Sequence, residues 1–355
     1  MIPLFQPFVP ENIQNEISTT LYSGQLAFGK EGNAFEQQLN QWLETKNALV
    51  VSSYDAALSL ILNIFGLKAN DEVALSPLCC LRSSQPLARL GVKVVWVDID
   101  PMTGTMSPES LRQKITPRTK LIINYHHLGY VGYSCDIYSI GKHYGIPVLE
   151  DCLDGIGGID HGKKAGTTCD AAVFSFDAVR LPNTIEGGAI WLSDNRLVEL
   201  AKLKRDLGID RALYRDERKE ARIDCDIAVT GFACKLNEIN SLIGQKQIPL
   251  LNQLLNNRAK NADFWQNYLS ETKQGTPLKI IYGTIPNYWV FGLLVKNKIE
   301  AIDQFRQLGY WASGVHVPNN NYSIFGKEPT LPGVQEFHEH FIALPCPCTT
   351  CLCDH

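Results

Sequence analysis

Short apolar runs alternate with longer polar segments through the first half of the chain. Between residues 48 and 195, runs rich in β-branched residues are each followed by about ten to fifteen polar, helix-compatible positions. The runs span residues 48–52, 72–75, 92–97, 121–124, 147–150, 171–176 and 188–192. Most are apolar on both faces, as in strands that helices cover on both sides. The pattern therefore predicts a mainly parallel sheet in an α/β domain, with ligands at the carboxyl ends of the strands.

A helical pattern follows from about residue 236 to 268. Its apolar positions are Leu236, Ile239, Leu242, Ile243, Ile248, Leu251, Leu254 and Leu255. Pro249 predicts a break or kink, because proline lacks an N–H group and clashes with the preceding turn. The later segments 279–282 and 288–295 are strand-like, 299–308 is helix-like and 314–317 is extended. These patterns predict a large domain over residues 1–245 and a small C-terminal α+β domain over residues 246–355.

Composition and charge narrow the class of protein. The 355 residues are 45% hydrophobic and 20% charged, which is ordinary for a globular chain long enough for two domains. With 33 basic and 37 acidic side chains, the net charge of −4 provides no broad positive field, so we expect neither nucleic acid nor a membrane as a partner. No run of 18 apolar residues is present, and the start of the chain does not resemble a signal peptide. Eleven cysteines, an odd number, favour free thiols and a cytoplasmic location.

Several short motifs occur in a characteristic order along the chain. They are Val51-Ser52-Ser53 with Ala56-Ala57-Leu58, Val97-Asp98-Ile99-Asp100-Pro101, Thr116-Pro117-Arg118-Thr119-Lys120, Leu149-Glu150-Asp151, Phe174-Ser175-Phe176, Glu186-Gly187-Gly188, Arg205-Asp206-Leu207-Gly208, Gly231-Phe232 and Gly314-Val315-His316-Val317-Pro318. In order and spacing, they resemble the DegT/StrS sugar aminotransferases, which are PLP-dependent enzymes of fold type I. The resemblance implies a large domain with a mostly parallel seven-stranded sheet, a small C-terminal domain and a homodimer with active sites at the subunit interface. Members of that family usually transfer an amino group to a nucleotide-linked keto sugar.

The position of the family's catalytic lysine is occupied by Arg180. In the family, this lysine lies six residues before the Glu-Gly-Gly turn and forms the Schiff base with PLP; here, Glu186 begins that turn. A lysine amine can lose its proton and attack a carbonyl group, whereas a guanidinium stays protonated and is a poor nucleophile. The substitution therefore predicts that ordinary PLP transamination is absent.

The family's phosphate-binding loop has changed as well. Its Ser-Gly-Thr sequence is Ser53-Tyr54-Asp55 here. Glycine lets backbone N–H groups approach a phosphate, and Tyr54 adds bulk at that position. Asp55 places a carboxylate where the anion would bind, and like charges at close range repel. Because Asp is a good helix N-cap, we interpret Asp55 as the residue that caps the following helix.

Other positions of the family's PLP site are partly kept. The resemblance assigns Cys80 to the place of an aromatic residue that stacks on the pyridine ring, and Asp154 to that of a glutamine near the ring hydroxyl. An asparagine and an arginine that the partner subunit contributes correspond to Ala233 and Lys235. Asp151, which pairs with the ring nitrogen in the family, and Ser175, which contacts the phosphate, are retained.

Two interpretations of the altered site stay open. In the first, the protein is a degenerate member that binds a ligand or assembles with other proteins: Arg180 pairs with Asp151, Asp154 or Asp177, or else grips an anionic ligand such as a nucleotide sugar. In the second, PLP or PMP binds noncovalently for an aminotransferase or dehydratase reaction with another base. Related sugar 3-dehydratases replace the lysine with histidine, so the bases considered are His126, His127 and Lys235; His316 lies near the family's substrate cleft.

Partners and metals follow from the same analysis. We expect a homodimer and a nucleotide-sugar ligand, and an intact paralogue is a further candidate partner. No metal ligands are assigned to the PLP-like site. The last ten residues contain Cys346, Cys348, Cys351, Cys353 and His355, whose side chains are good zinc ligands, but the spacing of paired zinc knuckles is absent. Metal binding by this C-terminal cluster therefore stays open.

Overall fold

A seven-stranded sheet forms the centre of the molecule in the computed structural model, which describes residues 1–326, 328 and 331–354. The strand order is β1-β11-β10-β7-β6-β2-β3. The strands span β1 Ala48–Val51, β2 Glu72–Leu75, β3 Lys93–Trp96, β6 Thr119–Tyr125, β7 Val148–Cys152, β10 Ala171–Ser175 and β11 Gly188–Leu192. β11 pairs antiparallel with both of its neighbours, and the other pairings are parallel. The seven predicted runs and the mostly parallel sheet are confirmed.

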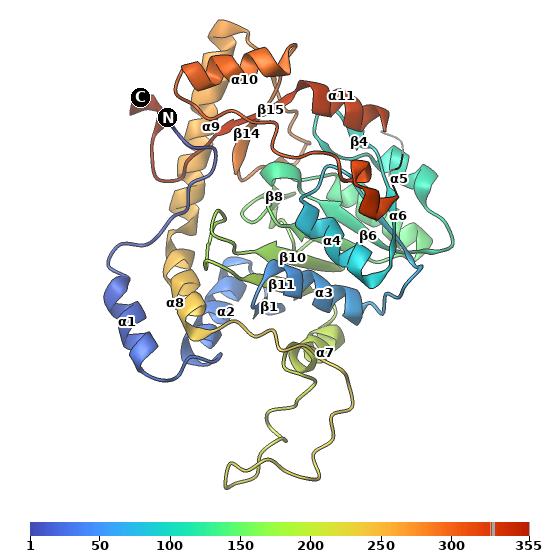
Figure 1. The fold of residues 1–355 in the computed structure, drawn as a ribbon, viewed down its shortest axis with the longest axis vertical. Helices are drawn as coiled ribbons and strands as arrows, with labels where there is room; N and C mark the ends of the chain where they lie inside the picture. Colours follow the sequence, from blue (N-terminus) through green and yellow to red (C-terminus); the bar gives the residue numbers. More distant parts are fainter. Residues whose placement is uncertain (327, 329–330, 355) are drawn as a thin grey trace.

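Helices cover both faces of this sheet (Figure 1). They span α3 Tyr54–Ile64, α4 Leu81–Leu90, α5 Pro108–Lys114, α6 Ser134–Tyr144 and α7 Asn195–Arg205. Helices α1 Gln14–Tyr22 and α2 Lys30–Trp42 precede the first strand. The carboxylate of Glu238 accepts hydrogen bonds from the backbone N–H groups of Gly29, Glu31 and Gly32. A distant part of the chain thus satisfies N–H groups at the amino end of α2 that have no partner within the helix.

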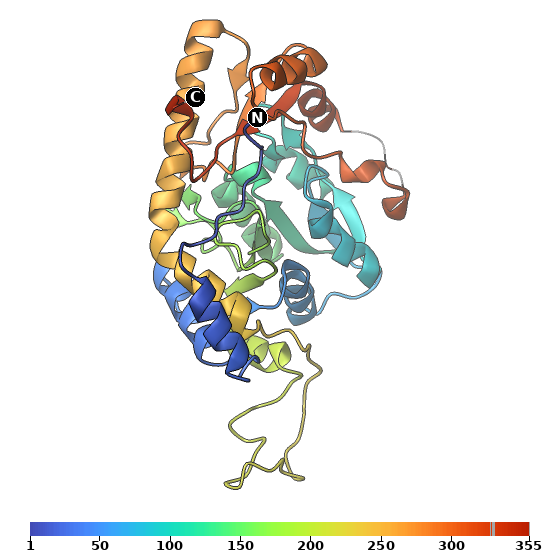
Figure 2. The same cartoon turned by 60° about the vertical axis from the view of Figure 1, so that its left-hand side comes forward.

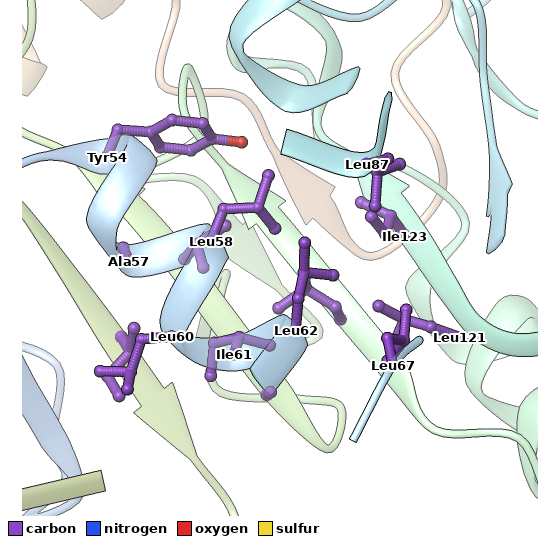
Figure 3. Packing of buried hydrophobic residues seen from close by; sticks show 14 of the residues in the cluster. Tyr54, Ala57, Leu58, Leu60, Ile61, Leu62, Leu67, Leu87, Leu121 and Ile123 are labelled. Carbon is purple, nitrogen blue, oxygen red and sulfur yellow. The ribbon is translucent and has the colours of Figure 1, made fainter. Parts of the chain in front are cut away.

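Helix α3 shows how the sequence builds this layer. Ser53 accepts the N–H of Ala56 at 3.0 Å and caps the helix, and Gly66, with φ +68°, ends it in a Schellman-type turn. Leu58 and Ile61 are completely buried one turn apart (Figure 3). Each fully buried side chain of this size contributes about 1.5–3 kcal/mol relative to an exposed one, so α3 is held by its apolar face.

The predicted helix over residues 236–268 is divided as Pro249 indicated. Helix α8 (Glu238–Gln247) passes through a 3-10 turn at Ile248–Leu250 into the long helix α9 (Leu251–Thr272). Figure 2 shows the two helices running along one side of the molecule, with α1 and α2 beside α8. The predicted domain boundary between residues 245 and 246 falls near the end of α8 and stays a prediction.

The C-terminal part contains a small antiparallel sheet in the order β12-β14-β15, flanked by helices. These elements are β12 Thr276–Pro277, β14 Val290–Leu294, α10 Lys298–Gln307, α11 Pro332–His340 and β15 Phe341–Pro345. The predictions for 288–295 and 299–308 are confirmed. The strand predicted at 279–282 is wrong, because Tyr282 is 92% exposed and no apolar face is buried there. The extended run at 314–317 is interrupted by Val315, whose φ is +58°.

Short elements complete the fold. The remaining strands are β4 Ile99–Asp100 with β5 Thr105–Met106, and β8 Ile159–Asp160 with β9 Lys163–Lys164 and β13 Thr284–Ile285. Further 3-10 turns lie at His127–Gly129, Asn319–Asn321, Ser323–Phe325 and Leu352–Asp354. Within the described part of the chain, no helix has both the length and the apolar character that crossing a membrane requires.

Candidate functional site

The predicted site residues meet at the carboxyl edge of the central sheet. Asp151 lies at the end of β7, and Ser175 ends β10. Asp154 and Arg180 lie in the loops that follow these strands, and Tyr54 begins α3 directly after β1. The parallel arrangement brings these segments together, as the strand pattern predicted.

Tyr54 turns inward and reaches Asp151. Its hydroxyl donates to Asp151 Oδ2 at 2.7 Å and lies 2.9 Å from Ser83 Oγ, while the N–H of Leu153 donates to Asp151 Oδ1 at 3.0 Å. Burial raises the pKa of Asp151 to about 6, and hydrogen bonds from Ser83 and Tyr54 oppose that rise. Burial also raises the pKa of Tyr54, with a further contribution from the charge of Asp151. Both oxygens of Asp151 thus have donors from the chain itself.

Arg180 pairs with Asp154, one of the three carboxylates considered for it. Arg180 Nη2 lies 2.8 Å from Asp154 Oδ1, and the side chains are 8% and 0% exposed. Tyr125 donates its hydroxyl to Asp154 Oδ2. The guanidinium carbon lies 3.8 Å from the ring centroid of Trp289, which stacks in turn on Phe5 at 4.2 Å. The cation is therefore held between a carboxylate and an aromatic face.

Asp177 and Ser175 are engaged elsewhere in the same region. Arg82 Nη1 forms an ion pair with Asp177, and its Nη2 lies 3.0 Å from Glu186 Oε1. The N–H of Asp177 donates to Ser175 Oγ at 3.3 Å. Ser175, the candidate phosphate ligand, is completely buried under this arrangement.

The amino end of α3 corrects one prediction. The N-cap is Ser53, whose backbone is extended (φ −162°, ψ 165°), because the first helical residue is Tyr54. Asp55 lies in the first turn and pairs instead with Arg89 Nη2 at 2.9 Å. A cavity of about 500 Å³ lies outside this turn, and its lining includes Ser53, Asp55, Arg89 and Ala233.

Cys80 borders the site but is poorly suited to act as a nucleophile. Burial and the charge of Asp154 raise its pKa to about 11, so the thiol stays protonated near neutral pH. Lys235 lies apart from Asp151, in an ion pair with Asp206 at 3.1 Å.

Of the three candidate histidines, His126 and His127 are buried and His316 is partly buried. His126 Nε2 lies 3.1 Å from Glu150 Oε1, and its Nδ1 accepts the N–H of Gly132. His127 Nδ1 lies 2.9 Å from the carbonyl oxygen of Leu78, and burial, with the nearby His316, lowers its pKa to about 3. Burial likewise lowers the pKa of His316. The imidazoles of His127 and His316 therefore favour the neutral state.

Several buried polar atoms around Arg180 have no hydrogen-bond partner among the described residues. They are Arg180 Nε and Nη1, Asp154 Oδ1, Asp177 Oδ1, His127 Nε2 and His316 Nε2. The contact between Arg180 and Asp154 is therefore an ion pair without hydrogen-bond alignment. A second buried cation, Arg258 on α9, is close enough to interact electrostatically with Arg180. Unsatisfied buried donors are costly, and acceptor oxygens would satisfy those of Arg180.

Sequence reasoning missed several residues of this site. Tyr125 ends β6, so the rule that ligands bind at strand ends could have found it. Arg82, Ser83, Trp289 and Arg258 come from α4, the segment before β14, and α9, and no motif marks them.

Comparisons with known proteins agree with the geometry. The sequence profile described as the DegT/DnrJ/EryC1/StrS aminotransferase family matches residues 8–346. The spore coat polysaccharide biosynthesis protein SpsC of Bacillus subtilis is 27% identical over 97% of this chain and 92% of its own. A dTDP-4-dehydro-2,3,6-trideoxy-D-glucose 4-aminotransferase of Saccharopolyspora spinosa is 24% identical over 97% of this chain and 91% of its own.

Solved structures give the same result for the fold. AtS13 from Actinomadura melliaura superposes with a TM-score of 0.93 at 26% identity, covering 100% of this chain and 96% of that protein. The sugar aminotransferase CalS13 from Micromonospora echinospora superposes with a TM-score of 0.92 at 27% identity, covering 100% and 97%. The fold is therefore the PLP-transferase fold type I, and the chain belongs to the DegT/DnrJ/EryC1/StrS aminotransferase family.

Proposed function

We propose that this protein binds an anionic nucleotide sugar, in nucleotide-sugar or surface-polysaccharide biosynthesis, without carrying out ordinary PLP transamination. The observation that carries the proposal is the hydrogen bond from Tyr54 to Asp151. By resemblance, Asp151 is the carboxylate that pairs with the nitrogen of the cofactor ring. Here it accepts a hydrogen bond from the side chain of Tyr54 instead. Fold alone does not decide activity, so the chemistry of this site must do so.

The residues present do not fit PLP in the family's manner. The family's cofactor needs an amine, a carboxylate for the ring nitrogen, and donors for the phosphate. Arg180 offers no nucleophilic amine, and both oxygens of Asp151 accept hydrogen bonds from the chain. Ser175 Oγ accepts the N–H of Asp177, and the end of α3 is capped by Ser53. Asp151 and Ser175, which the resemblance assigns to cofactor binding, thus have hydrogen-bond partners within the chain, and Arg180 lacks the nucleophilic amine.

Buried positive charge supports an anionic ligand. Arg180 and Arg258 are 7% and 4% exposed, and Asp154 is the carboxylate paired with Arg180. Arg180 Nε and Nη1 and Arg258 Nε have no hydrogen-bond partner within the described residues. Phosphate or carboxylate oxygens would satisfy these donors. Nucleotide sugars carry such phosphates, and the Saccharopolyspora spinosa relative is named for a dTDP-linked sugar.

No specific observation favours noncovalent catalysis with PLP or PMP. His126 has partners for both ring nitrogens, and Lys235 is ion-paired with Asp206. The pKa of His127, lowered to about 3, leaves its imidazole a weak base. Titration with the two cofactors distinguishes this second interpretation from the proposed one.

The segment between α7 and α8 supports the proposed homodimer. It extends far from the body of the molecule (Figures 1 and 2) and carries apolar side chains in the open, with Leu213 57% and Ile223 104% exposed. Exposed apolar side chains of this kind are common where another chain binds. Light scattering of the purified protein would test the dimer, and a pull-down would test an intact paralogue as a partner. The cytoplasmic location stays a prediction.

Titration with PLP and with PMP tests the proposal directly. Cofactor absorbance is followed, and intact mass is measured after borohydride reduction, with the Saccharopolyspora spinosa aminotransferase as positive control. We expect no saturable spectral change and no adduct. Saturable binding without an adduct would support the noncovalent enzyme instead, and an adduct would reveal a substitute lysine, with Lys235 mapped first.

Calorimetric titration with dTDP- and GDP-linked sugars tests the binding role. We expect binding by the wild type and at least a ten-fold loss in Arg180→Gln, since a bidentate charged contact is removed. Arg89→Gln, which changes an exposed arginine paired with Asp55, is the matched control. The binding role would be overturned if Arg180→Gln and Arg89→Gln bound the nucleotide sugars with equal affinity, or if the wild type bound none of them.

A further inference from the structure

A cysteine, an aspartate and a histidine converge on the surface, outside the site described above. Cys135 lies near the start of α6, Asp160 ends β8, and His161 follows in the turn to β9. One ligand atom from each lies within 4.8 Å of the other two. We propose that Cys135, Asp160 and His161 form a Zn²⁺ site.

The distances between the donor atoms suit a tetrahedral metal. Zinc bonds of about 2.3 Å to sulfur and about 2.0–2.1 Å to nitrogen place the two ligand atoms roughly 3.5 Å apart at a tetrahedral angle. Cys135 Sγ lies 3.5 Å from His161 Nδ1. His161 Nδ1 lies 2.7 Å from Asp160 Oδ1, shorter than the roughly 3.3 Å that a shared ion needs. The His161 side chain is 48% exposed, so its ring is free to make this small shift.

Neighbouring groups hold these ligands in place. Asp160 is 2% exposed, and its second oxygen, Oδ2, accepts the hydroxyl of Thr168 at 3.2 Å. Thr168 is itself fixed by its N–H, which donates to Glu150 Oε2 at 2.9 Å. The backbone N–H of His161 donates to the carbonyl oxygen of Gly283 at 2.7 Å. Hydrogen bonds behind the ligands are typical of functional metal sites.

The local charge favours a cation. Asp136 follows Cys135 in the first turn of α6 and Asp160 is itself a ligand, whereas a nearby lysine, Lys163, lies two residues after His161. Zinc binding replaces the thiol proton: the S–H bond breaks, an S–Zn bond forms and one proton is released to solvent. Mixed sulfur, nitrogen and oxygen donors suit Zn²⁺ better than Mg²⁺ or Ca²⁺. With three protein ligands, one position is left for water.

Cobalt, a coloured substitute for zinc, makes the site measurable. The full chain is prepared with Cys351→Ser and Cys353→Ser, which removes one partly exposed and one exposed thiol near the C-terminus, and is titrated with Co²⁺ alone. We expect one ion per chain, with a sulfur-to-cobalt absorption that Zn²⁺ abolishes. In the same background, Cys135→Ser removes the absorption, and Cys225→Ser, which changes a loop cysteine remote in sequence, retains it.

Two further variants distinguish metal binding at this site from adventitious binding elsewhere on the protein. His161→Ala should weaken metal binding at least ten-fold, and Thr168→Val, which removes the hydroxyl that donates to Asp160 Oδ2, should weaken it about ten-fold. Zn²⁺ should also protect Cys135 from alkylation by iodoacetamide, as read by peptide mass. Cys135 and His161 are exposed, so thermal melting should confirm that these variants fold. No Co²⁺ binding by the background protein, or unchanged binding in Cys135→Ser, would overturn the proposal.

Discussion

The hydroxyl of Tyr54 donates a 2.7 Å hydrogen bond to Oδ2 of Asp151, and both side chains are completely buried. The first residue of α3 is thereby joined to the end of β7, 97 residues later in the chain. By resemblance, the related aminotransferases have glycine at the position of Tyr54. Their carboxylate at the position of Asp151 pairs with the cofactor ring. Under the proposed function, this contact gives the family's carboxylate a partner from the chain itself.

Tyr54→Phe should destabilise the protein measurably. The change keeps the aromatic ring but removes the donor to a buried carboxylate, so the free energy of unfolding should fall by about 1.5–3 kcal/mol. Urea denaturation of the two proteins provides the measurement. Tyr22→Phe, at a side chain that is 84% exposed, is the control and should change stability by less than about 0.5 kcal/mol. Equal effects at the two positions would contradict the role assigned to the Tyr54 hydroxyl.

Asp151 should leave a signature in the pH dependence of stability. Its pKa, raised by burial to about 6 in the folded state, exceeds the value of about 3.9 in the unfolded chain. The folded state therefore binds the proton more tightly, and this contribution is present below about pH 4 and lost as pH rises through about 6. Asp151→Asn removes the titration. Relative to wild type, the variant should gain about 2 kcal/mol between pH 4 and pH 7. Parallel stability profiles would argue against the raised pKa.

Arg180→Lys alone should not restore the family's chemistry. The change supplies an amine, but Tyr54 still donates to Asp151, and Ser175 still accepts the N–H of Asp177. We expect no cofactor adduct by intact mass after borohydride reduction, and no transfer of an amino group to a nucleotide-linked keto sugar. Turnover by this single variant would show that the remaining groups permit PLP binding.

Ser53 and Asp55 should differ in their effect on stability. Ser53→Ala removes the N-cap of α3 and should cost about 0.5–2 kcal/mol. Asp55→Ala removes an exposed ion pair with Arg89 and a carboxylate in the first helical turn, which together contribute roughly 1 kcal/mol or less. Thermal or urea unfolding of both variants compares them directly. A larger loss of stability in Asp55→Ala than in Ser53→Ala would indicate that Asp55 is the N-cap of α3.

The apolar pattern by itself determined most of the architecture. The strands of the central sheet and the interruption at Pro249 follow from local rules, because a buried strand needs a continuous apolar run and proline cannot continue a helix. The order of the motifs likewise indicated the family. The strand predicted at 279–282 failed because its apolar residues have no layer to pack against, which a local pattern does not reveal.

The tertiary structure alone decided which partners the site residues have. Asp151, Asp154 and Asp177 were equal candidates for Arg180, and the packing of Trp289 and Tyr125 selected Asp154. The inward turn of Tyr54 was equally beyond the sequence, because hydrogen bonds between distant segments depend on how those segments pack. The same holds for the surface group at Cys135, which becomes apparent only when α6 and β8 are placed side by side.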